Sequence, residues 1–165
     1  MMKLNLKVIK KGFTLIEMLV VISLIGILAA LSLVSFTSVQ KQARDTVRKS
    51  DLKQYQNALE AYANLVSGLF PSRTAVSSAY STLCGDLNLK LEPDISCSQD
   101  PKTINDATYY DYKYISNGTN GTATATKYVL WGKIENSSTT KYIIYCSDGK
   151  IGESATAPST STCPI

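Results

Sequence analysis

Apolar side chains occupy residues 13–36 almost without interruption, and Glu17 is the only ionisable group among them. As a helix, these 24 residues would be about 36 Å long at 1.5 Å per residue. That length is enough to cross a bilayer core of roughly 30 Å. The segment before them is rich in lysine and ends at Gly12. The pattern therefore predicts a transmembrane helix that follows a basic leader.

The helical pattern continues beyond Phe36. Apolar residues recur at spacings of 5, 3, 4, 3 and 4, which predicts an amphipathic helix with one buried stripe. The stripe consists of Val47, Leu52, Tyr55, Leu59, Tyr62 and Val66. The polar side chains that we expect on a solvated or subunit-facing surface are Lys49, Lys53, Gln56, Asn57, Glu60 and Asn64. Gly68 and Pro71 are stop signals, so we predict one helix from Phe13 to about Leu69, with its amphipathic part over 37–70.

The last third of the chain has the alternating, aromatic pattern of β-strands. We predict strands over 109–115, 127–135 and 141–146, with a short fourth strand at 150–152. Residues 72–108 are rich in Ser, Asp and Pro and are predicted to form a variable loop. The expected fold class is α+β, with the long N-terminal helix packed on an antiparallel sheet (109–152) in a head formed by residues 71–165.

Charge and residue types narrow the possible functions. The formal net charge is +4, but four of the 17 basic residues lie in the first 12 positions, and without them 13 basic residues face 13 acidic ones. The near-neutral remainder gives no reason to expect nucleic acid as a direct partner. Histidine is absent, which removes the usual general base, and neither a phosphate-binding glycine loop nor a CxxC pair is present. We therefore expect no enzyme and no cofactor.

The start of the apolar run carries a specific motif. Lys11-Gly12-Phe13-Thr14-Leu15-Ile16-Glu17, followed by the apolar helix, resembles the cleavage motif of type IV pilins and of the pseudopilins of type II secretion. The resemblance implies that a prepilin peptidase removes the cytoplasmic leader, residues 1–12, by cutting after Gly12. It also implies that Phe13 becomes the N-methylated terminus and that Glu17 is the assembly residue.

Glu17 has a physical reason to promote assembly. A carboxylate inside a membrane helix costs about 2.5–3.5 kcal/mol near the bilayer centre and less near an interface. Cleavage would create an ammonium group at Phe13 at a similar depth, and in a helical filament this group could pair with Glu17 of another subunit. The alternative is that Glu17 snorkels to the interface or stays protonated.

A secretory signal peptide is a rival interpretation of the N-terminus. Ala30-Leu31-Ser32 has the small-x-small pattern of a signal cleavage site, and the leader is suitably basic. The apolar run is longer than the usual 7–15 residues, however, and a general signal peptide has no use for Glu17. These differences favour the prepilin motif.

The four cysteines predict two disulfides in an extracytoplasmic domain. They are Cys84, Cys97, Cys146 and Cys163, and three connectivities are possible. Local pairing, Cys84–Cys97 and Cys146–Cys163, closes short loops, and the second bond would tie the tail back to the sheet. A zinc site of four cysteines is the alternative, but the paired close spacing of such sites is missing.

Other features have weaker signals. Asn117, Asn120 and Asn136 fit the glycosylation acceptor pattern, although turn chemistry explains them equally well. Carboxylates that could contribute to a calcium site are Asp106, Asp111 and Asp148, but no spacing requires one, so we assign no metal. Basic residues near the membrane side of the helix are Lys41, Arg44, Arg48 and Lys49. We interpret them as a solvated or subunit-bridging face, and the eight tyrosines after residue 79 as strand formers at the sheet surface rather than an adhesive face.

The resemblance implies a structural subunit of a type IV pilus, which serves adhesion, twitching motility or DNA uptake. Its expected partners are copies of itself, the prepilin peptidase, a membrane assembly platform with its ATPase, and the lipid bilayer before assembly. The expected location is the cytoplasmic membrane, with a single pass and the N-terminus inside, and then the extracellular filament. A pseudopilin of a short periplasmic filament and a non-assembling membrane-anchored binding protein are the alternatives.

Overall fold

The computed structural model describes residues 12–91, 96–103 and 111–165, and leaves out the side chains of 31–35. The predicted leader therefore lies outside the described residues, except for Gly12. The chain forms two compact units, which divide between Val39 and Gln40. The helix α1 (Leu15–Leu65) contributes residues to both units.

In the first unit, α1 has an exposed apolar surface. Its described residues are apolar on all sides, and the large side chains of Leu15, Ile22 and Leu28 are exposed. Among the described residues, no helix is both long enough and apolar enough to cross a membrane. The single pass over 13–36 therefore stays a prediction.

The end of α1 lies four residues before the predicted end. The helix stops at Leu65, and the backbone N–H of Gly68 donates to the carbonyl of Ala63 at 2.8 Å. This bond closes the helix as in a Schellman motif, in which the residue before the donor is left-handed. That residue is Ser67, with φ 59°, and Gly68 also has a positive φ of 82°. Pro71 lies beyond this turn and does not itself end the helix.

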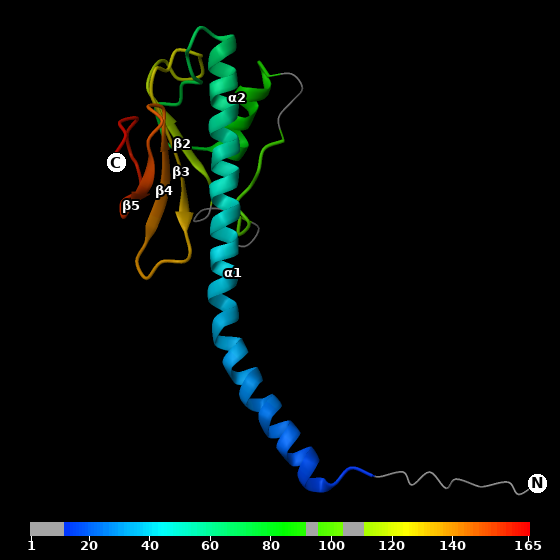
Figure 1. Ribbon diagram of the computed structural model, residues 1–165. Helices are drawn as coiled ribbons and strands as arrows, with labels where there is room; N and C mark the ends of the chain where they lie inside the picture. The colour runs from blue at the N-terminus through cyan, green and yellow to red at the C-terminus, as the bar shows by residue number, and fades with distance from the viewer. Residues whose placement is uncertain (1–11, 92–95, 104–110) are drawn as a thin grey trace, which may run out of the picture. The chain divides into compact units, whose positions relative to one another are not determined.

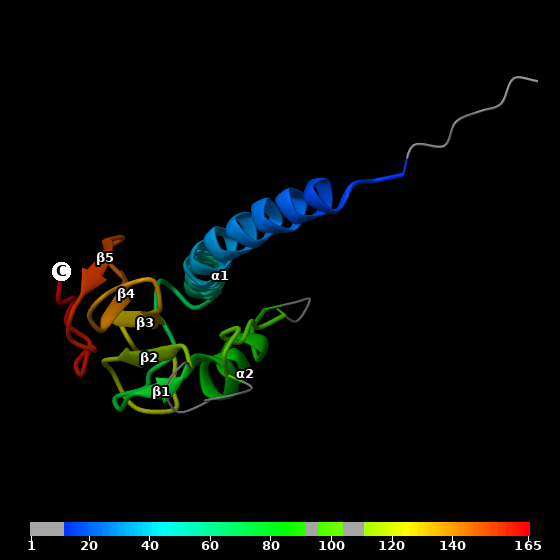
Figure 2. The same ribbon diagram turned by 90° about the horizontal axis from the view of Figure 1, so that it is seen from below.

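The second unit contains a five-stranded antiparallel sheet in the order β1-β2-β3-β4-β5. The strands are β1 (Ser77–Ser78), β2 (Lys113–Ser116), β3 (Tyr128–Ile134), β4 (Lys141–Cys146) and β5 (Ile151–Ser154). Each strand pairs with the next one in the sequence, and Figure 2 shows this order across the sheet. The predicted α+β fold with an antiparallel sheet is confirmed. Tyr109 and Tyr110, at the start of the first predicted strand, lie outside the described residues.

The two faces of the sheet bury different sets of side chains. One face packs on α1 and includes Tyr114, Tyr128 and Leu130, which share a core with Leu52 and Leu59 of the helix (Figure 1). The other face carries a second cluster, which consists of Ile115, Val129, Trp131, Ile144 and Cys146. Because successive side chains of a strand alternate between faces, β3 supplies residues to both clusters.

The tyrosines of the sheet are mainly core residues rather than surface ones. Tyr112, Tyr114 and Tyr128 are fully buried, and their hydroxyl groups find partners inside the unit. Tyr112 donates to a carboxylate oxygen of Asp51 at 2.7 Å, and Tyr114 donates to the carbonyl of Pro71 at 2.8 Å. The interpretation of these side chains as a ring at the sheet surface is therefore wrong, because buried tyrosines are accepted where the hydroxyl is satisfied.

The prediction of a continuous loop over 72–108 is wrong in its first half. After β1 the chain forms a π-helical turn, η1 (Ala79–Leu83), and a short helix, α2 (Cys84–Asn88). Ala79, Leu83 and Leu87 are four residues apart and fully buried, whereas Leu89 is 78% exposed. The helical spacing of Ala79, Leu83 and Leu87 was the informative signal in this segment.

Candidate functional site

The predicted cleavage position precedes α1. Gly12, Phe13 and Thr14 lie outside regular secondary structure, and all three are exposed. Phe13 is 80% exposed, and a Cβ added to Gly12 would meet open space. A peptidase needs an accessible backbone that is not locked in a helix, and this segment offers one immediately before the first helical turn.

Glu17 closes the first turn of α1 in a capping box. Thr14 is the N-cap residue, and Glu17 accepts its backbone N–H at 2.8 Å and its hydroxyl at 2.7 Å. In return, the backbone N–H of Glu17 donates to the Thr14 hydroxyl at 3.3 Å. This reciprocal arrangement satisfies backbone donors that have no partner within the helix. We did not predict this role for Glu17, although the Thr-x-x-Glu pattern is the usual sequence signal of a capping box.

Two of the four residues of the predicted basic face, Arg44 and Arg48, belong to an ion-pair network in the second unit, whereas Lys41 and Lys49 are exposed. Arg48 has no exposed surface, whereas Val47, which was placed in the buried stripe, is 46% exposed. The Arg48 guanidinium donates to Asp100 at 2.5 and 2.9 Å and to Asp45 at 2.7 Å. It also donates to Glu135 at 2.5 Å. Arg48 is therefore a core residue and is not available to a filament neighbour, a lipid or DNA.

Glu135 connects further residues to this network. It accepts hydrogen bonds from Arg44 at 2.8 and 3.0 Å, and it pairs with Lys102 at 3.3 Å. Asp45 accepts the backbone N–H groups of Glu135 and Asn136 at 2.9 and 2.7 Å. We call the set the Arg48 network. Its members are Arg44, Asp45, Arg48, Asp100, Lys102 and Glu135. The network contains three cations and three carboxylates. Their ion pairs connect α1 with the segment 100–102 and with Glu135, which directly follows β3.

The network changes the acidity of its members. Burial lowers the pKa of the Arg48 guanidinium, but the hydrogen bonds to Asp100 and Glu135 outweigh burial and raise this pKa above its usual value. Burial raises the pKa of Glu135, but the hydrogen bonds from Arg44 and Arg48 prevail and lower it to about 2. Both groups are thus held in their charged forms at neutral pH.

Acid should weaken the second unit through Glu135. Because the folded-state pKa of Glu135 is lowered from 4.5 to about 2, its contribution to stability is complete above pH 4.5 and is lost as the pH falls toward 2. We expect the difference in urea midpoint between the native chain and Glu135→Gln to shrink over this range. Glu153→Gln is the matched control, because Glu153 forms an exposed pair with Lys141 at 3.4 Å. A difference that does not change with pH would contradict this role of Glu135.

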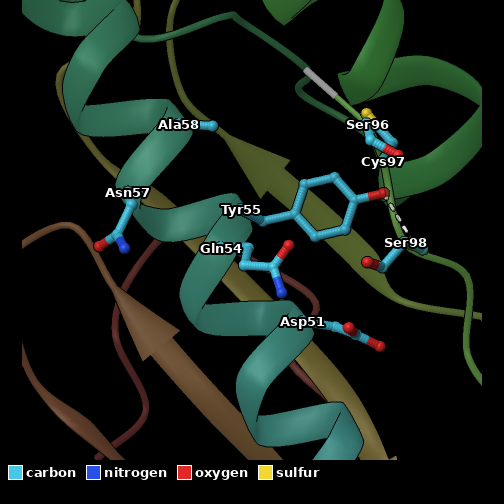
Figure 3. Close-up of a pocket in the computed structure, with 8 residues that line it drawn as sticks. All are labelled: Asp51, Gln54, Tyr55, Asn57, Ala58, Ser96, Cys97 and Ser98. Atoms are coloured by element: carbon cyan, nitrogen blue, oxygen red, sulfur yellow. Dashed lines mark hydrogen bonds between the residues drawn. The ribbon is translucent and has the colours of Figure 1, made fainter.

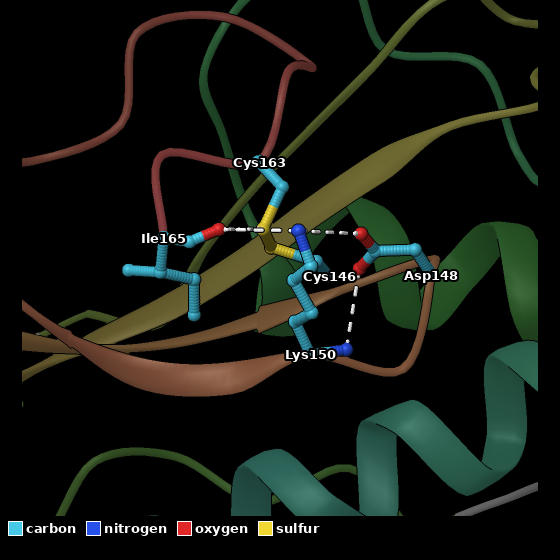
Figure 4. The surroundings of a disulfide bond; sticks show 5 residues. All are labelled: Cys146, Asp148, Lys150, Cys163 and Ile165. Carbon is cyan, nitrogen blue, oxygen red and sulfur yellow. Dashed lines mark hydrogen bonds and ion pairs between the residues drawn. A yellow bond between two sulfur atoms is a disulfide. The ribbon is translucent and has the colours of Figure 1, made fainter.

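Both predicted disulfides are confirmed. Cys84 and Cys97 are bonded with their Cα atoms 6.0 Å apart, and Cys146 and Cys163 with theirs 5.7 Å apart. The second bond ties the C-terminal tail to the end of β4. In the turn after β4, the ammonium group of Lys150 lies between the carboxylate of Asp148 and the carbonyl of Ile165, at 3.5 Å from each (Figure 4). The four-cysteine zinc site is therefore ruled out. Cys146 and Cys163 also lie close to Asp148, but their sulfur atoms are committed to the disulfide.

The structure gives little support to the aspartates considered for a calcium site or to the asparagines considered for glycosylation. Asp106 lies outside the described residues, Asp111 pairs with Lys113 at 3.0 Å, and Asp148 pairs with Lys150 at 3.5 Å. The side chain of Asn117 is used within the head, because its oxygen accepts the backbone N–H groups of Thr126 and Lys127 at 2.8 and 3.0 Å. Asn120 and Asn136 are exposed, and their modification stays untested.

A cavity of about 370 Å³ lies between α1 and the segment 96–98. Figure 3 shows the ring of Tyr55 reaching from α1 toward Ser98, whose carbonyl accepts the Tyr55 hydroxyl at 2.9 Å. Asp51 and Gln54 line the same cavity from the helix, and Cys97 lines it from the opposite side. Its polar groups are mostly neutral, and it lies next to the first disulfide.

Comparisons with known proteins agree with the N-terminal motif. The family model "Prokaryotic N-terminal methylation motif" matches residues 9–33. The type II secretion system core protein G of Pseudomonas aeruginosa is 47% identical over 53 residues, which cover 32% of this chain and 37% of that protein. The type IV major pilin protein PilA of Myxococcus xanthus is 36% identical over 52 residues, which cover 32% of this chain and 24% of that protein.

A third relative, the fimbrial protein EcpC of Eikenella corrodens, is 34% identical over 86 residues, which cover 48% of this chain and 52% of that protein. The chain therefore spans between about a quarter and about half of the length of these relatives. No solved structure matches the chain. The long N-terminal helix on an antiparallel sheet defines an α+β protein with a pilin-like fold. The methylation motif and these relatives support the same resemblance, to type IV pilins and to the pseudopilins of type II secretion.

Proposed function

We propose that this protein is a structural subunit of a type IV pilus. A prepilin peptidase removes residues 1–12, Phe13 is methylated, and the apolar part of α1 holds the subunit in the cytoplasmic membrane by a single pass. A membrane platform with its ATPase then assembles copies of the chain into an extracellular filament. The observation that carries the proposal is the apolar surface of α1, which begins directly after the accessible Gly12–Phe13 bond and is exposed along its described length.

An exposed apolar helix of this kind requires either lipid or other protein around it. Contiguous apolar patches of more than a few hundred Å² are rare on soluble monomers and mark interaction surfaces. Lipid would cover the helix before assembly, and helices of neighbouring subunits would cover it in the filament. Both environments have the same apolar chemistry, so the subunit can exchange one for the other.

Glu17 would favour the transfer of the subunit from lipid into the filament. The capping box holds its carboxylate at the start of α1, close along the chain to the new terminus at Phe13. In an array of staggered helices, the ammonium of one subunit can approach Glu17 of another. Pairing of the two charges offsets the cost of keeping each of them in an apolar environment, so the filament is favoured over the single subunit.

A pseudopilin of a type II secretion system is the second candidate. It is supported by the 47% identity to core protein G, which covers about a third of each chain. Both candidates polymerise through the same helix, so they differ in the length and location of the filament. A filament that stays within the periplasm would favour the pseudopilin.

Two measurements test the proposal: imaging of surface filaments and determination of the N-terminal residue of the mature chain. We expect electron microscopy of sheared cell-surface material to show thin filaments, and mass spectrometry to find a peptide that begins with N-methylated Phe13. Gly12→Leu is the matched control, because a bulky residue before the cut should leave the leader attached and prevent both results. Filaments made of chains that keep residues 1–12 would overturn the proposal, and a processed chain without filaments would favour a membrane-anchored binding protein.

A further inference from the structure

The C-terminal tail covers the face of the sheet that is turned away from α1, and we call residues 155–165 the strap. Two side chains of the strap, Cys163 and Ile165, pack against the apolar cluster on this face (Figure 4). Gly152 of β5 makes room for the second of them, because a Cβ at this position would lie 2.9 Å from Cδ1 of Ile165. The members of this outer cluster, none of them more than 3% exposed, are Ile115, Val129, Trp131, Ile144 and Cys146.

Burial alone holds the strap weakly. Seven of its eleven residues are exposed, three are half-buried, and the remaining one, Pro158, is buried. A cavity of about 280 Å³ is lined by Pro158 of the strap and by Trp131 and Tyr142 of the sheet, so the packing beneath the strap is incomplete. Burial of so few side chains offsets only part of the conformational entropy that is lost when the whole strap is held in place.

Polar contacts add little at either end of the strap. Next to β5, the Ser154 hydroxyl exchanges hydrogen bonds with the backbone of Thr156 at 3.0 and 3.1 Å, and these bonds shape a local turn. At the other end, the ammonium group of Lys150 reaches the carbonyl of Ile165 at 3.5 Å, and the side chain of Lys150 is 60% exposed. A long contact that is open to water contributes little to stability.

The disulfide is therefore the main anchor of the strap. It joins Cys163 to Cys146, at the end of β4 and 17 positions away, and so restricts the conformations that a released strap could adopt. Cys146 is 1% exposed, whereas Cys163 is half-buried. Because thiol–disulfide exchange requires access to one of the two sulfur atoms, Cys163 is the side from which this bond can be attacked.

We propose that the strap is a redox-controlled cover, which the disulfide keeps closed over the outer cluster and which opens on reduction by a dithiol. One thiolate of the dithiol attacks the sulfur of Cys163 and displaces Cys146. The second thiol then attacks the mixed disulfide, releases Cys163 and leaves the dithiol as a disulfide. The two electrons and two protons that the dithiol loses end on the thiols of Cys146 and Cys163. The reverse exchange, with a disulfide as oxidant, closes the strap again.

Opening of the strap is a local event in this fold. The core on the α1 side, the Arg48 network and the Cys84–Cys97 bond contain no residue of the strap, so β2, β3 and β4 should stay paired when it leaves. What changes is the outer face, where an apolar patch of the kind that binds other apolar surfaces becomes exposed. The cover does not depend on the filament proposal, because a pilus, a pseudopilus or an anchored monomer would carry it equally.

Trp131 reports on the state of the strap, since it belongs to the outer cluster and is the only tryptophan of the chain. The measurement is the rate constant of acrylamide quenching for the full chain in detergent micelles. It is calculated with the fluorescence lifetime of each form, because a disulfide can itself quench a nearby tryptophan. We expect dithiothreitol to raise this rate constant several-fold, while the far-UV circular dichroism signal of the sheet is kept.

A chain with both Cys146→Ser and Cys163→Ser is the matched control, because it retains the Cys84–Cys97 bond and so separates the effects of the two disulfides. It should show the raised quenching constant without dithiothreitol, and dithiothreitol should add no comparable rise. An unchanged constant in this variant would overturn the proposal. So would a further rise with dithiothreitol as large as that of the native chain, or loss of the circular dichroism signal of the sheet in the variant.

Discussion

Replacing Glu17 with alanine is expected to abolish filaments while leaving a processed, membrane-bound subunit. The substitution removes the only carboxylate of the apolar run, so the ammonium at Phe13 of a neighbouring copy loses its partner. Because Gly12 and Phe13 are unchanged, the peptidase should still cut. The measurement is electron microscopy of surface filaments together with immunoblotting of the membrane fraction for the mature chain.

Glutamine at position 17 separates the two roles of this residue. A capping box accepts either Glu or Gln at its third helical position, so Glu17→Gln should keep the first turn of α1 but lose the charge. If charge pairing drives assembly, this variant should lack filaments as Glu17→Ala does. Normal filaments from Glu17→Gln would assign the role to the capping box, and normal filaments from Glu17→Ala would remove both explanations.

Replacing Arg48 with alanine is expected to destabilise the second unit by about 3–5 kcal/mol, the usual cost of removing one partner from a buried ion pair. The substitution leaves the carboxylates of Asp45, Asp100 and Glu135 without their shared guanidinium. Lysine should not restore the loss, because it cannot reproduce the fork geometry with which arginine reaches several carboxylates. The measurement is the free energy of unfolding in urea of the oxidised chain.

Arg44→Ala is the matched control for Arg48→Ala. Both arginines bond to Glu135 from the same helix, but the side chain of Arg44 is 29% exposed, and within the described part of the chain it forms an ion pair with Glu135 alone. Exposed and partly exposed pairs contribute about 0–1 kcal/mol, so the loss should be several-fold smaller. Equal losses in the two variants would show that burial of Arg48 does not set its contribution.

The Arg48 network also shows where sequence reasoning failed in this protein. The alternation of Lys41, Arg44, Arg48 and Lys49 with acidic residues along α1 is typical of a solvated face, and nothing local distinguishes Arg48 from its neighbours. Its burial depends on Asp100 and Glu135, which are 52 and 87 positions away. A charge can be buried only where partners converge on it, and that convergence is a property of the folded chain.

The sequence by itself determined the features that depend on local physics. The apolar run, the cleavage motif around Gly12, the helical period before Leu65 and the alternation in β3 and β4 all follow from neighbours a few residues apart. Tertiary structure alone decided which of three cysteine pairings forms, and which tyrosines and which arginine are buried. These outcomes depend on the register of strands and on contacts between distant segments, because side chains far apart in the chain interact only once the backbone has brought them together.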